Sequence, residues 1–533
     1  MLKFALTSFV AMGACFAAAQ AWVPAWSVQV GNPAGKNVIP IKTAWDSYNG
    51  HVCVLSQAPS SYVLTLEEFD GAGNLVASGS CGAAGFGNFT LSASSHPPQE
   101  VAPVDMTIDA YGNIYVLTSY NGGFVANEPM TVGRFNVVGS AINLTGQVNS
   151  TPPIGNGYYP VSIKLGSSGQ IWVLGDNQYI SPGGCYDQGD VLVKINNALA
   201  VVETETYYNP RTVQQPASIT YGVGETIVPF GILPVKLYVF PDSVHGDKAF
   251  FIANTGSYTS TPPPFYYQNV FSYDDAVGWH DPIFVNSGAM DPAEYYTALE
   301  DINGDANGVY VSGHIAGHPY QVLNYGIDDV AAKVANVAAG VLTYPAAWAF
   351  AGGPWPTDLT SNYANVPGYT YMSSGDLWPG PGWQAAPTAG QQDANILALD
   401  GTGNLYLSGL SIFPYQTGLH SCVFAGGIDS IKLTTATFAY VWGPTYWGTT
   451  TTAYTTSYDS ATSGIADAAG VFILGLYQSD TALVQISPAG ATVKSYNTGT
   501  EAAPKNIVFG SSGEIYALSG YVAGHAYLRR FTP

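Results

Sequence analysis

A short pattern recurs along this chain of 533 residues: a turn that contains Gly is followed by a strand of alternating apolar and aromatic residues. The clear copies are SYNGHVCVL at 47–55, DAYGNIYVL at 109–117, GSSGQIWVL at 166–174, DANGVYVS at 305–312, DGTGNLYLS at 400–408, DAAGVFIL at 467–474 and GSSGEIYAL at 510–518. A degenerate copy, VHGDKAFFI, occupies 244–252. Self-similarity at this spacing is typical of repeat proteins, so it constrains the fold more than any single residue does.

Most copies are followed by a hairpin, in which two alternating strands flank a short polar turn. The clearest hairpins lie at 62–77, 190–202, 429–442 and 480–493. With the strands before it, each unit supplies three or four antiparallel strands, which is the content of one β-propeller blade. The Gly residues of successive copies are 43 to 95 residues apart. Such variable loops suit propeller blades better than the near-constant stacking of a solenoid.

The repeats therefore predict an all-β fold, a single closed β-propeller of four-stranded antiparallel blades. Eight copies favour eight blades, and seven is the alternative because the copy at 244–252 is out of register. The segment Trp22–Val30 resembles 441–448, the outer-strand region of the sixth unit. We expect it to supply the outer strand of the last blade, formed around Gly513–Phe531, and thereby to close the ring without an exposed edge.

Two stretches of the sixth unit carry a family resemblance. The residues GNLYLSG at 403–409 and GGIDSIKL at 426–433 resemble the bacterial beta-propeller repeat of secreted and surface proteins. That repeat reads G-N-x-Y-[VL]-x-G, then a loop, then Asp and an alternating strand with Lys. The resemblance extends over nearly the whole mature chain and implies a propeller scaffold. It implies no activity, because this scaffold serves many roles.

The first residues are typical of an export signal. Lys3 supplies the positive charge, Phe4–Ala19 is an apolar run too short for a membrane span, and Ala19-Gln20-Ala21 is an A-x-A cleavage site. We therefore expect a signal peptide at 1–21 and a propeller domain at 22–533. The predicted localisation is secreted or periplasmic. A lipoprotein cut before Cys15 is the weaker alternative, because Met12 replaces the usual Leu.

The charge balance limits the partners that the protein can bind. Lys and Arg number 15 against 36 Asp and Glu, which gives a formal net charge of −21. A field of that sign repels phosphate backbones and anionic headgroups, so we expect no nucleic-acid partner. No later apolar stretch is long enough to span a bilayer. We expect a monomer that has a glycan or a protein as its ligand.

Four cysteines follow the predicted cleavage site: Cys53, Cys81, Cys185 and Cys422. An even number in an exported protein permits two disulfides. Cys53 lies in a first-blade strand and Cys81 just past its last strand, so they can be paired. Free buried thiols are the alternative.

The aromatic residue after each turn is expected to fill the space between blades rather than to contact a ligand. These residues are Tyr115, Trp172, Tyr310, Tyr406, Phe472 and Tyr516. Lys194 and Lys432 are similarly expected to lie along strand faces without a catalytic role.

One segment has the spacing of a metal site. Asp301, Asn303, Asp305 and Asn307 place oxygen side chains at alternate positions of a tight loop, and Ca²⁺ prefers oxygen ligands. The loop lacks the Gly and Glu that the EF-hand pattern has at its sixth and twelfth positions. The hypothesis is a Ca²⁺ site at these four residues. The alternative is an ordinary blade turn preceded by two extra polar residues.

The long insertion at about 345–392 is rich in Pro, Gly and aromatic residues. Loops on a rigid scaffold commonly carry function, and exposed Trp and Tyr bind sugars or anchor partner chains. The predicted binding residues are Trp355, Tyr369, Trp378 and Trp383. The alternative is a loop that packs on the blade edges and covers apolar surface.

The sequence carries no catalytic motif: it has no G-x-S-x-G elbow, P-loop or zinc-protease helix. We therefore interpret the chain as an exported, non-enzymatic propeller that binds or scaffolds at the cell envelope or outside the cell. One alternative is a polysaccharide lyase or hydrolase that uses acidic residues in the central channel. A second alternative is a structural surface protein.

Overall fold

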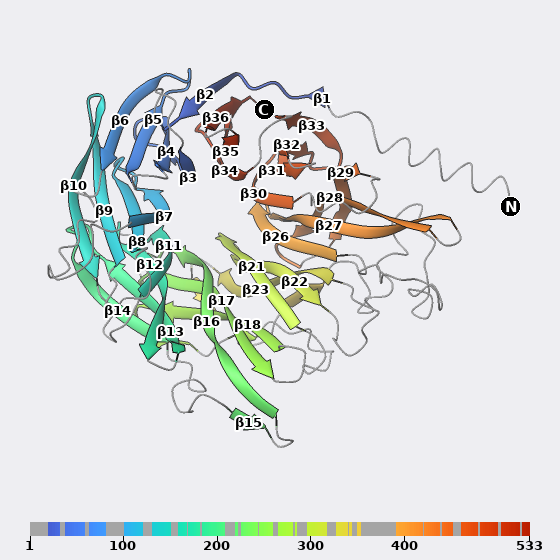
Figure 1. The fold of residues 1–533 in the computed structure, drawn as a ribbon, viewed down its shortest axis with the longest axis horizontal. Helices are drawn as coiled ribbons and strands as arrows, with labels where there is room; N and C mark the ends of the chain where they lie inside the picture. The colour runs from blue at the N-terminus through green and yellow to red at the C-terminus, as the bar shows by residue number, and fades with distance from the viewer. Residues whose placement is uncertain are drawn as a thin grey trace. The chain divides into compact units, whose positions relative to one another are not determined.

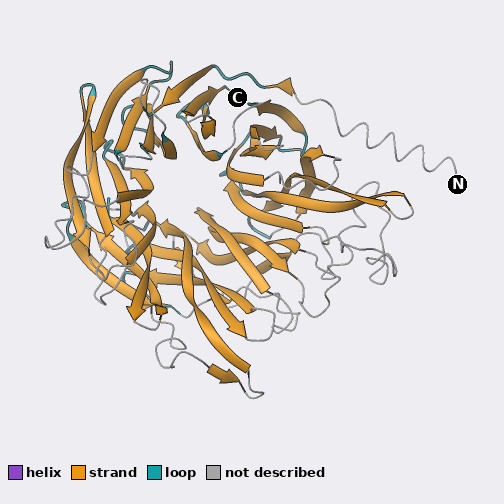
Figure 2. Ribbon diagram, in the orientation of Figure 1, coloured by secondary structure: helices purple, strands orange, loops and turns teal. Residues whose placement is uncertain are grey.

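The computed structural model describes residues 20–31, 38–58, 63–81, 101–120, 130–150, 158–167, 169–181, 184–207, 219–221, 225–242, 245–259, 265–280, 283–284, 296–316, 327–338, 341–343, 349–352, 391–418, 421–437, 440–450, 460–477, 480–498, 503–522 and 525–532. All regular structure in these ranges is β-strand, so the predicted all-β class is confirmed (Figure 2). The described residues include no helix that could cross a membrane.

The chain divides into two compact units. The first unit comprises Pro24–Phe284 and Lys505–Pro533, and the second comprises Met1–Val23 and Val285–Pro504. The strands of the first unit, with β34 beginning at the boundary, are β2 (Trp26–Val30), β3 (Ile39–Asp46), β4 (His51–Gln57), β5 (Leu64–Phe69), β6 (Leu75–Cys81), β7 (Val101–Ile108), β8 (Ile114–Tyr120), β9 (Met130–Val138), β10 (Ala141–Ser150), β11 (Tyr158–Leu165), β12 (Ile171–Ser181), β13 (Gly184–Ile195), β14 (Val201–Tyr207), β15 (Ile219–Tyr221), β16 (Glu225–Phe240), β17 (Lys248–Thr259), β18 (Phe265–Asp274), β19 (Gly278–Trp279), β20 (Ile283–Phe284), β34 (Pro504–Phe509), β35 (Ile515–Val522) and β36 (His525–Phe531) (Figure 1). The strands of the second unit are β1 (Gln20–Ala21), β21 (Tyr296–Asp305), β22 (Gly308–Ala316), β23 (Ile327–Ala338), β24 (Val341–Thr343), β25 (Ala349–Gly352), β26 (Gln391–Leu399), β27 (Asn404–Gly418), β28 (Ser421–Thr434), β29 (Tyr440–Thr450), β30 (Ser460–Asp467), β31 (Gly470–Tyr477), β32 (Asp480–Ile486) and β33 (Thr492–Asn497).

Consecutive strands pair into antiparallel meanders. In the first unit these are β3–β6, β7–β10, β11–β14, β15–β19 with β20 on β18, and β34–β36 with β2. In the second unit they are β21–β23 with β24 and β25 on β23, then β26–β29, and β30–β33 with β1 on β33. Most meanders have four main strands, which confirms the predicted four-stranded antiparallel sheets. Closure into one ring and the number of blades remain predictions.

Two pairs of meanders are joined at their edges into larger sheets. Strands β6 and β10 make one parallel contact, between Ser78 and Ala141. Gly79 permits it, because a Cβ at this position would lie 2.1 Å from the carbonyl oxygen of Ile142. Each joined strand therefore has less free edge for pairing with another chain.

Neighbouring meanders pack face to face within each unit. Cys53, Leu55 and Leu66 of the first meander pack against Ile114 and Val116 of the second. The opposite face of the second meander packs against the third, since side chains alternate along a strand. The aromatic residues after the turns are all buried, with exposed fractions of 0–1%, as predicted: Tyr115, Trp172, Tyr310, Tyr406, Phe472 and Tyr516.

The repeated turn is fixed by its own carboxylate. In the second repeat Asp109 Oδ1 accepts hydrogen bonds from the backbone N–H groups of Tyr111 and Asn113, each at 2.9 Å. Gly112 has φ +76°, a conformation that is strained for residues with a Cβ. Asp and Gly therefore recur in the sequence because the turn requires both.

The predicted outer strand of the last sheet is confirmed for β2. Strand β2 pairs antiparallel with β36 from Trp26 opposite Arg530 to Val30 opposite Ala526. The prediction was wrong for Trp22, which lies in the second unit and not in the outer strand of the last sheet. There its N–H donates to the carbonyl of Ser495 at 2.7 Å, and its ring is 6.0 Å from that of Phe472. Pro24 separates the two segments, and a residue without an N–H group interrupts a continuous strand.

Candidate functional site

Two of the residues predicted to bind Ca²⁺ connect neighbouring strands of the second unit. Asp301 is buried in β21, where its Oδ2 accepts the N–H of Leu397 at 2.9 Å and its Oδ1 accepts the N–H of Ile302 at 2.7 Å. Asn303 Nδ2 donates to the carbonyl oxygen of Leu397 at 3.4 Å. The structure thus directs both side chains toward β26.

Asp305 and Asn307 lie together in the following turn. Asp305 Oδ1 accepts the N–H of Asn307 at 2.7 Å and that of Gly308 at 3.2 Å, and it also accepts the hydroxyl of Tyr310 at 3.2 Å. These are the bonds of the ordinary repeat turn. Among the described residues no three His, Cys, Asp or Glu side chains are grouped so that they could hold a metal. The Ca²⁺ site stays a prediction.

Calcium binding is checked by melting the protein with and without a chelator. If the four residues hold Ca²⁺, the chelator should lower Tm, because a ligand bound only by the folded state stabilises it. Asp301→Ala should then remove this sensitivity. No change in Tm at millimolar Ca²⁺ would dispose of the site.

The other predicted binding residues lie outside the described residues. Trp355, Tyr369, Trp378 and Trp383 all fall in 353–390. Their role as ligand-binding residues therefore remains a prediction.

A cation lies opposite the buried aromatic residue in several repeats. The cross-strand pairs are Tyr115 with Arg134, Trp172 with Lys194, Tyr310 with Lys333, Tyr406 with Lys432 and Tyr516 with Arg530. Lys194 Nζ is 4.9 Å from the ring centroid of Trp172, and Lys432 Nζ is 5.4 Å from that of Tyr406. Such contacts between a cation and an aromatic ring stabilise the packing. Lys194 and Lys432 thus lie along strand faces, as predicted.

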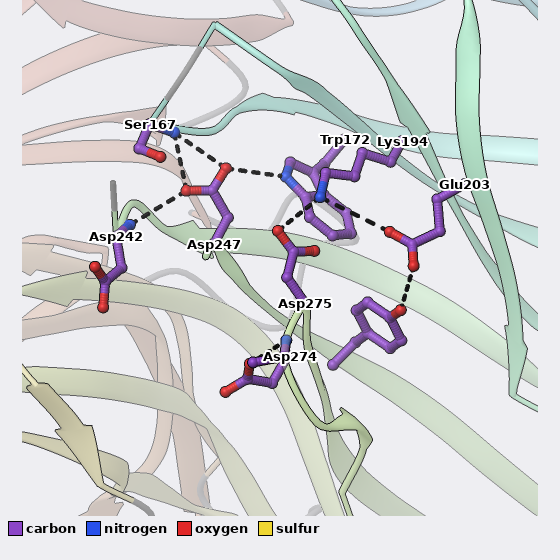
Figure 3. A network of polar contacts seen from close by, with 10 residues as sticks. Ser167, Trp172, Lys194, Glu203, Asp242, Asp247, Asp274 and Asp275 are labelled. Atoms are coloured by element: carbon purple, nitrogen blue, oxygen red, sulfur yellow. Dashed lines mark hydrogen bonds and ion pairs between the residues drawn. The ribbon is translucent and has the colours of Figure 1, made fainter. Parts of the chain in front are cut away.

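Acids of the third and fourth meanders form ion pairs with one of these cations, Lys194. Lys194 Nζ lies 2.6 Å from Asp275 Oδ2 and 3.7 Å from Glu203 Oε2 (Figure 3). The hydroxyl of Tyr273 donates to Glu203 Oε1 at 2.5 Å. Burial raises the pKa of Asp275, although Lys194 opposes the shift. This concentration of acids fixes the packing of two sheets.

In the third repeat the carboxylate that binds the turn comes from another meander. Gly166 stands where four other repeats have Asp, at 109, 305, 400 and 467, and Asp247 from the next meander takes that place (Figure 3). The N–H of Ser167 donates to Asp247 Oδ1 at 3.0 Å, and Trp172 Nε1 donates to Oδ2 at 3.4 Å. A Cβ at Gly166 would lie 1.8 Å from Asp247 Oδ2, so Gly166 makes room for this carboxylate.

The first strands of the meanders carry polar residues that the sequence interpretation missed. Asp105 of β7 is buried, contacts Lys42 of β3, and accepts the N–H of Ile163 in β11 at 3.0 Å. Asn506 of β34 bonds both the N–H and the carbonyl of Thr43 at 2.8 Å. A recurring Pro-x-polar triplet was the available signal, and it stands at 40–42, 103–105, 160–162, 234–236 and 504–506.

The first repeat lacks both the buried aromatic residue and the cation opposite it. Cys53 occupies the aromatic position, and Glu68 lies opposite it in place of a cation. Cys53 is a free buried thiol, so the predicted Cys53–Cys81 disulfide is wrong and the alternative of a free thiol holds for Cys53. Burial, with Glu68 and Asp46 nearby, raises the pKa of this thiol well above its usual range. A small residue at this position leaves room for a carboxyl side chain.

Glu68 lies next to a second buried acid, the turn carboxylate Asp46. The side chain of Glu68 is fully buried, its Oε2 is 3.3 Å from His51 Nδ1, and its Oε1 has no hydrogen-bond donor. Burial raises the pKa of Glu68 to about 7; a hydrogen bond from His51 opposes this shift and Asp46 adds to it. Paired acids with a strongly raised pKa are typical of functional sites, although structural networks also produce them.

Two exposed tyrosines lie on turns next to Asp46. Tyr48 and Tyr111 occupy the turns of the first and second repeats, with exposed fractions of 66% and 76%. A Cβ at Gly112 would lie 3.2 Å from Tyr48 Cδ1, so the two turns are in contact. Asp46 Oδ1 accepts the N–H groups of Tyr48 and Asn49 at 2.9 and 3.2 Å. We call Tyr48, Asn49 and Tyr111 the tyrosine surface.

The sequence matches no protein-family model and no curated protein. Among solved structures, the Dos1 propeller has 8% identity and a TM-score of 0.47, covering 96% of this chain and 95% of its own. The polysaccharide lyase Uly1 has 13% identity and a TM-score of 0.40, covering 83% and 94%. The alpha-L-arabinanase of Penicillium chrysogenum has 11% identity and a TM-score of 0.30, covering 56% and 83%.

Proposed function

We propose that this protein is an exported, non-enzymatic β-propeller that binds a glycan through the tyrosine surface. Its eight meanders are the blades of one ring, and the ring holds the surface rigid. The observation that carries the proposal is the pair of adjacent exposed tyrosines, Tyr48 and Tyr111, on turns whose backbones are fixed by buried or partly buried carboxylates. A flat ring with a polar tip on a fixed backbone costs little entropy when it binds.

A glycan fits this surface better than a protein does. A stable protein interface needs about 800 Å² from each partner and an apolar centre. Tyr48 and Tyr111 are two separate rings, and the polar side chains of Asn49 and His51 lie beside them. Two rings and a few hydrogen-bonding groups match the area of a short sugar chain.

The hydrogen bonds of the repeats favour binding over catalysis. Asp105, Asp247 and Asp301 are buried, and each accepts hydrogen bonds from neighbouring backbone. A catalytic acid must instead reach its substrate. The aromatic insertion at about 345–392 is proposed as a second part of the same ligand surface.

Binding is tested on a glycan array, followed by calorimetry with the best ligand. Tyr48→Ala and Tyr111→Ala should each weaken Kd by about tenfold or more, because each removes a stacking ring. Val277→Ser is the control, since Val277 is 71% exposed on a turn of the fourth meander. Trp378→Ala with Trp383→Ala tests the insertion separately. Unchanged binding by both tyrosine variants would contradict the proposal, and release of products from a polysaccharide would favour the enzyme alternative.

A further inference from the structure

The two acids of the first repeat are both buried. Asp46 ends β3 and Glu68 lies in β5, and Asp46 is close enough to raise the pKa of Glu68. Two buried carboxylates side by side repel each other unless one of them carries a proton. Glu68 Oε1 is buried and receives no hydrogen bond, so it is the atom left for that proton.

No Lys or Arg compensates this pair at the repeat position where other meanders have one. From β4 the facing groups are His51 and the thiol of Cys53. On β5 itself, Glu67 accepts the N–H of Gly31 at 2.5 Å. Asp70 follows in the next turn, where its Oδ1 accepts the N–H of Ala72.

The turn of the second meander at 109–113 carries no Lys or Arg. It presents the backbone of Gly112 beside Asp46 Oδ2, to which Asn49 Nδ2 donates at 2.7 Å. In that turn Asp109 accepts the N–H of Tyr111 and the hydroxyl of Tyr115, the latter at 3.1 Å. Among the described residues, the ionisable groups that act on Glu68 are therefore Asp46 and the imidazole of His51.

We propose that Glu68 carries a proton beside the Asp46 carboxylate, and that loss of this proton loosens the turn that carries Tyr48. The tyrosine surface is then ordered in mildly acidic medium and less ordered in alkaline medium. The link is direct, because the carboxylate that would be repelled by Glu68 is the one that holds the N–H groups of Tyr48 and Asn49. This inference rests on the proposed function only for its effect on glycan binding.

The direction of the pH effect follows from Glu68. Its pKa in the folded protein is raised to about 7, above the value near 4.5 of an unfolded chain. The folded state therefore binds more protons than the unfolded state between these values, and stability falls as pH rises through this range. The loss continues through pH 7 and is complete about one pH unit above it.

The decisive variant is Glu68→Gln, which keeps the shape of the side chain and cannot ionise. Hydrogen exchange of the amides at 47–50 is measured from pH 5 to pH 9 and corrected for intrinsic rates. In the natural protein, protection should fall about tenfold or more across pH 7. In Glu68→Gln it should not change. The turn at 110–113 is the internal control, because its repeat has Arg134 in place of Glu68.

Two outcomes would overturn the proposal: equal pH profiles in both proteins, or an equal loss of protection at 110–113. If Glu68→Gln does not fold, infrared difference spectra of the natural protein decide instead. They should show a protonated carboxylic acid at pH 6 that disappears by pH 8.5, and its absence at pH 6 would refute the proton on Glu68. Neither readout needs a ligand, so a failure of glycan binding leaves this inference standing.

Discussion

Deleting residues 22–30 is expected to destabilise the protein by on the order of 5 kcal/mol, or to make it aggregate. The deletion removes β2, whose Val30 is fully buried, and uncovers the hydrogen-bonding edge of β36. It also removes Trp22, which is 6% exposed against Phe472 in the second unit. Each large side chain contributes roughly 1.5–3 kcal/mol of buried apolar surface.

Thermal unfolding and light scattering measure this effect. Val23→Ser is the matched control, because Val23 lies in the same segment but is 74% exposed. Its Tm should stay within experimental error of the natural protein. A deletion variant that remains monomeric with an unchanged Tm would show that the last sheet does not depend on β2.

Replacing Asp105 by Ala is expected to cost about 3–5 kcal/mol, because it leaves a partly buried Lys42 without its acid. The same change frees the N–H groups of Met106 and Ile163, which now donate to this carboxylate at 2.9 and 3.0 Å. Asp70→Ala is the control. Asp70 accepts backbone hydrogen bonds within one partly exposed turn and has no buried cation as a partner, so its loss should cost no more than about 1 kcal/mol. Equal unfolding free energies for the two variants would contradict the assigned role of Asp105.

Asp105 should also make the free energy of unfolding depend on pH in the acid range. Burial acts to raise the pKa of Asp105, but Lys42 and Lys164 outweigh it, so the pKa is lowered. A lowered pKa in the folded state gives stability that is present above the unfolded value near 4 and is lost as pH falls below it. Chemical unfolding between pH 5 and pH 3 should therefore show a steeper loss of stability in the natural protein than in Asp105→Asn.

The sequence by itself determined the local structure of each repeat. The Asp and Gly of a turn act within four residues of each other, as Asp109 and Gly112 do. The alternation of the next strand determines which side chains are buried, and Tyr115 is 1% exposed as expected. These features were predictable because they depend on backbone geometry and on nearest neighbours in the chain.

Only the tertiary structure decided which acids meet which partners. Asp247 enters the turn at Gly166 from 80 residues away, and Asp105 binds the N–H of Ile163 from 58 residues away. No local pattern encodes such contacts, because they depend on the faces that two sheets present to each other. The pairing of Asp46 with Glu68 belongs to the same class. Its trace in the sequence was Cys53, a small residue where the other clear repeats have an aromatic one. The small side chain of Cys53 indicates that space is free beside it. That Glu68 fills this space is decided by the pairing and packing of the strands.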